Sequence, residues 1–194
     1  MVKKRILILD GHPAQTSISH QLARAYFDAA LQNGHDARIV SLHDLDFDPD
    51  YGFGGYKTQK PLEPDLESFL ESLEWCEHFV MISPMWWGGL PAKLKGLIDR
   101  TFLPGRTFDP RGAGLPKPLL SGRSAHVILT SDSPWWYFRF LLNRPLFWQL
   151  KKQILGFVGF KPVKVMHFAQ ASHPKAKDVE AWMRKVSVLG TQAA

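Results

Sequence analysis

Five short apolar runs recur along the chain and predict β-strands. The first, at residues 5–9, is continuously apolar after its arginine, as strands buried inside a sheet are. The predicted strands are Arg5–Leu9, Ala37–Leu42, Phe79–Ser83, Ala125–Thr130 and Val163–Phe168.

Segments with helical periodicity separate these runs. In Ser17–Gln32 the apolar residues follow the 3.6-residue repeat, and Asn33-Gly34 ends the pattern as helices commonly end. In Pro64–Glu77 leucines share one face while carboxylates occupy the others. Further helices are predicted at Lys93–Thr101, somewhere within Phe138–Phe157, and at Ala176–Leu189.

Alternation of strands and helices predicts βαβ crossovers and a parallel sheet. Five such units in 194 residues favour an α/β, flavodoxin-like, doubly wound fold with strand order 2-1-3-4-5 and helices on both faces. A single domain over residues 1–194 is expected, with its ligand site where strands one and three diverge. The loops Asp44–Pro61 and Leu103–Arg123 have a length typical of functional or disordered segments.

Composition favours a protein of a reducing compartment. The single cysteine, Cys76, excludes an intramolecular disulfide. Neither a signal peptide nor an apolar run of membrane-spanning length is found, so a soluble, cytoplasmic protein is expected. The eight histidines show no metal-binding spacing, and no metal site is expected.

Positive charge is concentrated late in the chain. The formal net charge is +6, and no acidic residue lies between Asp132 and Asp178. A basic surface of this kind suits nucleic acid, anionic lipid or a phosphorylated cofactor, or is simply a solvated face. Binding of nucleic acid is not expected. The basic residues of this stretch are Arg139, Arg144, Lys151, Lys152, Lys161, Lys164, Lys175 and Lys177.

The loop after the first predicted strand ends in hydroxyl side chains at the start of a helix. A helix start presents unpaired N–H groups and the positive end of the dipole, so Thr16, Ser17 and Ser19 suit a mononucleotide phosphate. The alternative is that these residues only cap the helix. His12 is a candidate donor to a phosphate or ribityl oxygen. The glycine patterns of dinucleotide-binding and NTP-binding loops are absent.

The loop after the third predicted strand, Ser83–Pro91, contains two tryptophans and two glycines. It lies where α/β proteins bind ligands, at the carboxyl end of a parallel strand. Flat aromatic rings beside glycine backbone suit a flat ligand with polar edges.

Together, the two loops carry a resemblance to a known family. A Gly-His-Pro-x-x-x-Ser-x-Ser pattern follows strand one, and Ser-Pro-Met-Trp-Trp-Gly-Gly-Leu-Pro-Ala-Lys-Leu-Lys-Gly-Leu-Ile-Asp-Arg-Thr-Phe follows strand three. The chain resembles the flavodoxin-like (flavodoxin-2 type) NAD(P)H:quinone oxidoreductases, which include ancillary flavoproteins of bacterial potassium-efflux systems. The matching positions are Pro84, Trp86, Pro91, Ala92, Leu94, Lys95, Gly96, Asp99, Arg100 and Phe102.

This resemblance implies a bound flavin, FMN with FAD as the alternative. It places the phosphate at the first loop, the isoalloxazine against the loop after strand three, and a third contact at the turn after strand four. That turn departs from the family pattern, because Asp132 and Ser133 stand where glycines are common. The implied cofactor-binding residues are His12, Thr16, Ser17, Ile18, Ser19, Pro84, Met85, Trp86, Trp87, Gly88, Thr130, Ser131 and Asp132.

The implied activity is two-electron, ping-pong transfer of hydride from NAD(P)H to quinones or similar acceptors. Family members have a tyrosine and a histidine after the third turn for proton handling; here Tyr137 is the candidate and no histidine lies nearby. The alternative function is a flavin- or nucleotide-binding regulatory subunit of a membrane transport system.

Aromatic residues crowd the segment Pro134–Trp148, beyond what one amphipathic helix buries in its own domain. A homodimer interface, a lid over the substrate and a membrane-surface contact are the functional interpretations, and an ordinary core helix is the alternative. The resemblance favours an interface that also forms a substrate wall, since the family is typically dimeric.

Overall fold

The computed structural model describes residues 2–52, 60–110 and 114–193. Its centre is a parallel five-stranded sheet in the order β2-β1-β3-β6-β7. This is the predicted 2-1-3-4-5 order, because β4 and β5 lie outside the main sheet. The strands of the sheet are β1 (Arg5–Asp10), β2 (Asp36–Ser41), β3 (His78–Pro84), β6 (Ser124–Ser131) and β7 (Val163–Ala169).

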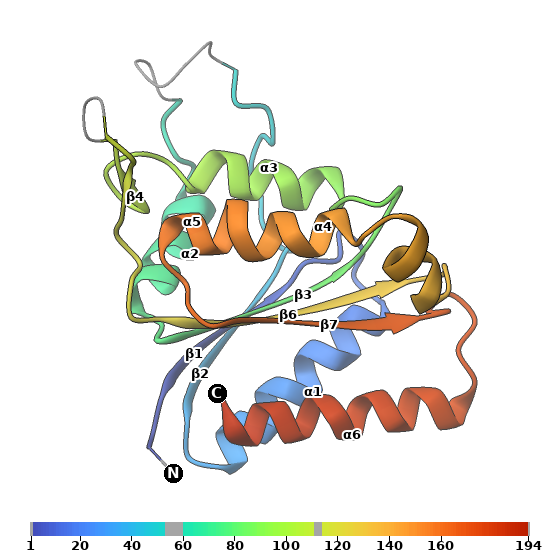
Figure 1. Ribbon diagram of the computed structural model, residues 1–194. Coiled ribbons are helices and arrows are strands. Elements are labelled where there is room, and N and C mark those ends of the chain that lie inside the picture. The colour runs from blue at the N-terminus through green and yellow to red at the C-terminus, as the bar shows by residue number, and fades with distance from the viewer. Residues whose placement is uncertain (1, 53–59, 111–113, 194) are drawn as a thin grey trace.

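Helices cover both faces of the sheet, as expected (Figure 1). One face is covered by α1 (Ile18–Gln32) and α6 (Ala176–Gln192), and the other by α2 (Pro64–Trp75), α3 (Ala92–Thr101) and a later helical segment. Each face has its own apolar core, with Leu22 and Ile128 on the first side and Phe69 and Phe79 on the second. No helix within the described ranges is long and apolar enough to cross a membrane.

The helix expected within Phe138–Phe157 is broken. It consists of η1 (Tyr137–Leu141), α4 (Pro145–Trp148), η2 (Gln149–Ile154) and α5 (Leu155–Val158), and both η elements are π-helical. Pro145 disfavours helical backbone in the residue before it, and Asn143 and Arg144 adopt left-handed φ angles of 51°. The break separates η1 from the α4–α5 rod, and η1 lies beside the carboxyl end of β7 (Figure 1).

The long loop Leu103–Arg123 contains a small element that the sequence did not predict. Strands β4 (Phe108–Asp109) and β5 (Lys117–Pro118) pair in an antiparallel ribbon. Part of this loop, and part of Asp44–Pro61, lies outside the described residues.

The described part of the loop Asp44–Pro61 is held against α3 by a buried arginine. Arg100 donates to the Glu63 carboxylate at 2.6 Å and to the backbone carbonyls of Asp48 and Pro61. Gly96 on the same helix permits the approach, because a Cβ there would lie 2.4 Å from the Cβ of Pro49. The glycine and arginine of the α3 pattern therefore have structural roles.

The amino edge of the sheet buries a polar cluster. The Tyr26 hydroxyl lies 3.0 Å from His78 Nε2 and 3.1 Å from His126 Nδ1. His78 Nδ1 lies 2.7 Å from Ser124 Oγ, so both nitrogens of this ring have partners. Burial lowers the pKa of His78 to about 2, so this ring is neutral at physiological pH.

Candidate functional site

At the opposite, carboxyl edge of the sheet, the loops after β1, β3, β6 and β7 surround a cavity of about 240 Å³. It brings together ten residues that the sequence proposed as cofactor ligands, from three separate loops. The lining residues are His12, Thr16, Ser17, Ile18, Pro84, Met85, Trp86, Thr130, Ser131, Asp132, Ala171 and Ser172.

The loop after β1 is fixed by close backbone approach to β3. The Gly11 N–H donates to the Ile82 carbonyl at 2.7 Å. A Cβ on Gly11 would lie 2.8 Å from Leu94 Cδ2 and 3.1 Å from that carbonyl, so a larger residue would push the loop away. Asp10 then holds the loop, since its carboxylate accepts from the His12 N–H at 3.2 Å and contacts His20 Nδ1 at 3.0 Å. Burial raises the pKa of Asp10.

The start of α1 carries an N-cap residue and a buried hydroxyl without a hydrogen-bond partner among the described residues. Ser17 is the N-cap, and its hydroxyl accepts from the His20 N–H at 3.0 Å, so the capping interpretation is correct for that side chain. The first turn carries no acidic residue. Ser19 Oγ is fully buried and has no hydrogen-bond partner among the described residues. A helix start with an unsatisfied hydroxyl is suited to an anion such as a phosphate.

A tight turn carries the two tryptophans of the loop after β3. Trp86 and Gly89 exchange backbone hydrogen bonds of 3.0 and 2.9 Å, and both residues between them have positive φ, 52° at Trp87 and 76° at Gly88. Positive φ is uncommon for a bulky residue and concentrates at ligand sites. The turn directs the Trp87 side chain fully into solvent.

Trp86, by contrast, lines the cavity. Its ring meets His12 edge-on, with centroids 5.7 Å apart and an interplanar angle of 86°. Trp87 and Gly88 lie outside the lining, as does Ser19, which is buried in α1.

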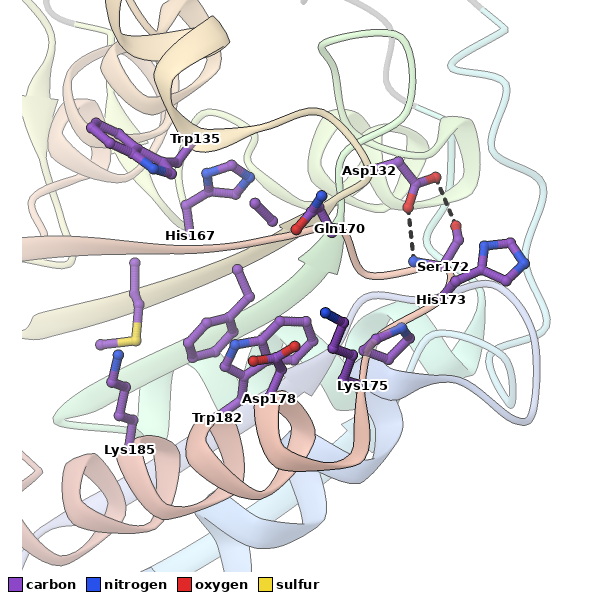
Figure 2. A pocket seen from close by; sticks show the side chains of 14 residues that line it. Asp132, Trp135, His167, Gln170, Ser172, His173, Lys175, Asp178, Trp182 and Lys185 are labelled. Atoms are coloured by element: carbon purple, nitrogen blue, oxygen red, sulfur yellow. Dashed lines mark hydrogen bonds between the residues drawn. The ribbon is translucent and has the colours of Figure 1, made fainter.

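The loops after β6 and β7 are tied to each other by Asp132. Its carboxylate accepts two 2.7 Å hydrogen bonds from Ser172, one from the backbone N–H and one from the hydroxyl (Figure 2). The Ser172 hydroxyl and N–H lower the pKa of Asp132. Ala171 N–H donates to the Ser131 carbonyl at 3.0 Å. Sequence reasoning missed Ala171 and Ser172, although their place after the last parallel strand puts them at this edge.

Tyr137 does not line this cavity, and it does not line the second cavity that is described below. It begins η1 and is partly exposed. A histidine reaches the edge of the site by another route. His167 on β7 places Nε2 2.8 Å from the Ser131 hydroxyl, between the rings of Phe138 and Phe147. Burial, and secondarily the charge of Arg144, lower the pKa of His167. The parallel pairing of β6 with β7 produces this contact between distant parts of the sequence.

A second, larger cavity of about 1010 Å³ adjoins the first and shares Asp132 and Ser172 with it (Figure 2). It runs along the edge strand β7 and the exposed side of α6. Trp182 stacks on Phe168 with centroids 5.1 Å apart. Lys175 and Lys185 line the same cavity together with the carboxylates of Asp132 and Asp178, so it offers aromatic surface and charged groups of both signs. Among the described residues, no group of three His, Cys, Asp or Glu side chains is arranged to hold a metal ion.

The fold and the cavity define an α/β protein with a cavity beside a helix start at the switch point of its sheet. A family model described as the flavodoxin-like fold matches residues 4–188, and the chain belongs to this family.

Relatives of known activity cover nearly the whole chain. An FMN-dependent NADH:quinone oxidoreductase of Acidobacterium capsulatum is 27% identical, covering 90% of each chain. The human ribosyldihydronicotinamide dehydrogenase [quinone] is 24% identical, covering 97% of this chain and 93% of its own.

Among solved structures, Smu.1420 from Streptococcus mutans UA159 is similar, with a TM-score of 0.78, 27% identity and coverage of 97% and 99% of the two chains. An NAD(P)H:quinone oxidoreductase from Methanothermobacter marburgensis has a TM-score of 0.81, 19% identity and coverage of 98% and 97%. An FMN-dependent NADH-azoreductase from Bacillus anthracis, solved with FMN, has a TM-score of 0.73, 17% identity and coverage of 98% and 99%.

Proposed function

We propose that this protein is a flavin-dependent NAD(P)H oxidoreductase that reduces quinones or similar acceptors, with FMN as its cofactor. One observation carries the proposal: a cavity at the sheet's switch point joins the start of α1, the Trp86 loop and the β6 turn. The relatives named as quinone oxidoreductases support it.

The residues present fit FMN. The start of α1, where Thr16, Ser17 and Ile18 line the cavity, would hold the phosphate, and His12 would contact a phosphate or ribityl oxygen. Trp86 and Met85 would lie along the flavin ring, and Thr130 and Ser131 would face its polar edge.

The protein's task is to orient the ring and to stabilise the charge that it gains. When bound, the flavin supplies the two-electron redox chemistry, taking hydride from NAD(P)H and passing it to a quinone. Hydroxyl and backbone N–H donors at the β6 turn are fixed in advance by the bonds between Asp132 and Ser172. Donors held where charge develops are the most effective form of electrostatic stabilisation.

A specific observation keeps FAD as the second candidate cofactor. The larger cavity adjoins the first and offers the ring of Trp182, stacked on Phe168, as aromatic surface that suits an adenine ring. FMN needs only the smaller cavity and the start of α1.

The test is release and identification of the cofactor. Protein purified from cells is heated, and the supernatant is analysed by mass; FMN is expected, and the mass of FAD would select the alternative. Anaerobic NAD(P)H should bleach the bound flavin, and benzoquinone should restore its colour. Protein that stays colourless when supplied with FMN or FAD would overturn the proposal.

We also propose a homodimer located in the cytoplasm. The buried Cys76 agrees with a reducing compartment, and an apolar groove lined by Phe102, Phe108 and Phe157 is suited to a second copy. Sedimentation of the purified protein measures the oligomeric state.

The competing function is a regulatory subunit of a membrane transport system, favoured by the basic and aromatic residues near the site. Steady turnover of NAD(P)H with benzoquinone, without any partner, would support the enzyme over the regulatory subunit.

A further inference from the structure

The turn that follows the site residue Asp132 leaves apolar side chains uncovered. We call this surface the aromatic patch. Phe140 and Leu141 are its most exposed members, at 65% and 62% of their full surface. The rings of Trp135 and Phe140 lie with centroids 6.0 Å apart, and clustered exposed apolar side chains of this kind mark an interaction site. The patch consists of Trp135, Trp136, Phe140, Leu141 and Leu142.

After Asp132, the chain beside the aromatic patch carries only positive charge. The Arg139 guanidinium lies 5.5 Å from the ring centroid of Phe140, and Lys151 and Lys152 are exposed on η2. No acidic residue occurs in residues 133–177. The surface therefore suits a partner with a negatively charged surface layer above an apolar interior.

We propose that the aromatic patch docks the protein on an anionic lipid bilayer. Tryptophan side chains favour the headgroup level, phenylalanine and leucine favour the acyl boundary, and Arg139 would meet lipid phosphates. A second copy of the chain is a poorer occupant, because a twofold interface would bring together two segments that carry only positive charge.

The aromatic patch lies beside the proposed active site, so docking would place that site near the bilayer. Trp135 and Asp132 line the same cavity (Figure 2), and Asp132 also lines the cavity assigned to the flavin. Docking would therefore bring the site to the bilayer surface. This step rests on the proposed function, and it names the acceptor class: quinones with long apolar tails, which dissolve in lipid.

The experiment is co-sedimentation of the full chain with vesicles. We expect binding to phosphatidylcholine–phosphatidylglycerol vesicles, no binding to phosphatidylcholine alone, and release by high salt. The variant Phe140→Ser/Leu141→Ser should weaken binding by about tenfold or more, and Arg139→Glu by about tenfold.

Two matched variants control for hydrophobicity and for charge. Val188→Ser removes an apolar side chain that is 52% exposed on α6, and Lys3→Glu reverses a charge before β1, at the opposite edge of the sheet. Both should bind vesicles as the parent does. Circular dichroism and thermal melting verify that each variant is folded.

Several outcomes would overturn the docking: no binding to anionic vesicles, equal binding to neutral vesicles, or equal losses in the control variants. Conversion of a dimer to a monomer by Phe140→Ser/Leu141→Ser would assign the patch to a second copy instead.

Turnover of benzoquinone without vesicles separates this proposal from the proposed function. If the parent binds vesicles but reduces no soluble quinone, the function fails and the docking stands. If it reduces soluble quinone but binds no vesicles, the docking fails alone. Phe140→Ser/Leu141→Ser, whose side chains line neither cavity, should slow the reduction of long-tailed quinone in anionic vesicles more than the reduction of soluble quinone.

Discussion

The two edges of the central sheet carry similar polar residues, which are hydrogen-bonded within a cluster at one edge and lie at a ligand cavity at the other. At the amino edge, Tyr26, His78 and His126 are buried and hydrogen-bonded to one another. At the carboxyl edge, His12 lines an open cavity, and the buried hydroxyl of Ser19 has no partner among the described residues.

This difference separates polar groups that stabilise the fold from those that remain available to a ligand. A buried polar group costs free energy unless it is paired, so a paired cluster serves stability. An orphaned buried hydroxyl at a helix start costs stability in the empty protein and suits an anion. Changes to the paired cluster at the amino edge should therefore alter stability alone, and changes to the cavity-lining groups at the start of α1 should alter flavin binding alone.

The largest expected effect is at the start of α1. Ser17→Asp keeps a good N-cap but places a carboxylate where the flavin phosphate is expected. Repulsion should lower FMN affinity by about hundredfold or more, close to 2.7 kcal/mol, while the free energy of unfolding changes by less than about 0.5 kcal/mol. Fluorescence titration with FMN and urea unfolding measure the two quantities.

Ser17→Asn is the matched control, because asparagine caps equally well and carries no charge. It should lose only a few-fold in FMN affinity. If both variants lost affinity equally, charge would not be the cause, and the phosphate would have to bind away from α1.

The second prediction concerns the amino edge. Tyr26→Phe removes the hydroxyl that joins His78 Nε2 and His126 Nδ1. The fully buried Nε2 of His78 then loses its hydrogen-bond partner. We expect a loss of about 2 kcal/mol in the free energy of unfolding. FMN affinity of the folded variant should remain within about twofold of the parent.

Tyr137→Phe, which removes a partly exposed hydroxyl, is the control and should change the free energy of unfolding by less than about 0.5 kcal/mol. A large effect of Tyr26→Phe on FMN affinity would show that the two edges are coupled.

Most of the fold was predictable from local sequence, and the site only in part. Apolar runs and crossover helices specified the sheet, and the two motif loops specified His12, Ser17 and Trp86. These features are local, so one sequence contains their signal.

The remaining features depend on tertiary contacts. Ser172 joins the site through Asp132, and His167 joins it through Ser131, across separations of 40 and 36 residues. Neither pair has a local signal. The π-helical turns of η1 and η2 follow a helix-like pattern in the sequence and have no distinct signal, whereas the break between η1 and α4 has one in Pro145.

The third prediction is a pH dependence that originates at the amino edge. Folded His78 has a pKa of about 2, whereas an unfolded histidine takes up a proton near 6.5. Below pH 6.5 the unfolded chain binds more protons, so stability falls as the pH falls, by about 1.4 kcal/mol per pH unit from this residue.

His78→Gln should reduce that slope by about the same amount between pH 6 and pH 5. Urea unfolding at several pH values gives the slope of the unfolding free energy against pH for the parent and for the variant. A lower stability of the variant shifts its free energy by the same amount at each pH and leaves the slope unaffected. Unchanged slopes would mean that another group dominates the acid sensitivity.

The smallest effect is expected at His167, which belongs to the carboxyl edge but is packed as the amino-edge histidines are. Its Nε2 holds the Ser131 hydroxyl, which also lies 3.3 Å from the Ser133 carbonyl and can donate to it. His167→Leu should fill the space between Phe138 and Phe147 while releasing Ser131, and lower FMN affinity about threefold to fivefold. His167→Gln, whose amide can donate to the same hydroxyl, should stay within about twofold of the parent. Equal losses in the two variants would mean that His167 acts by packing between the rings, and the separation between stabilising and ligand-facing polar groups would then fail at this residue.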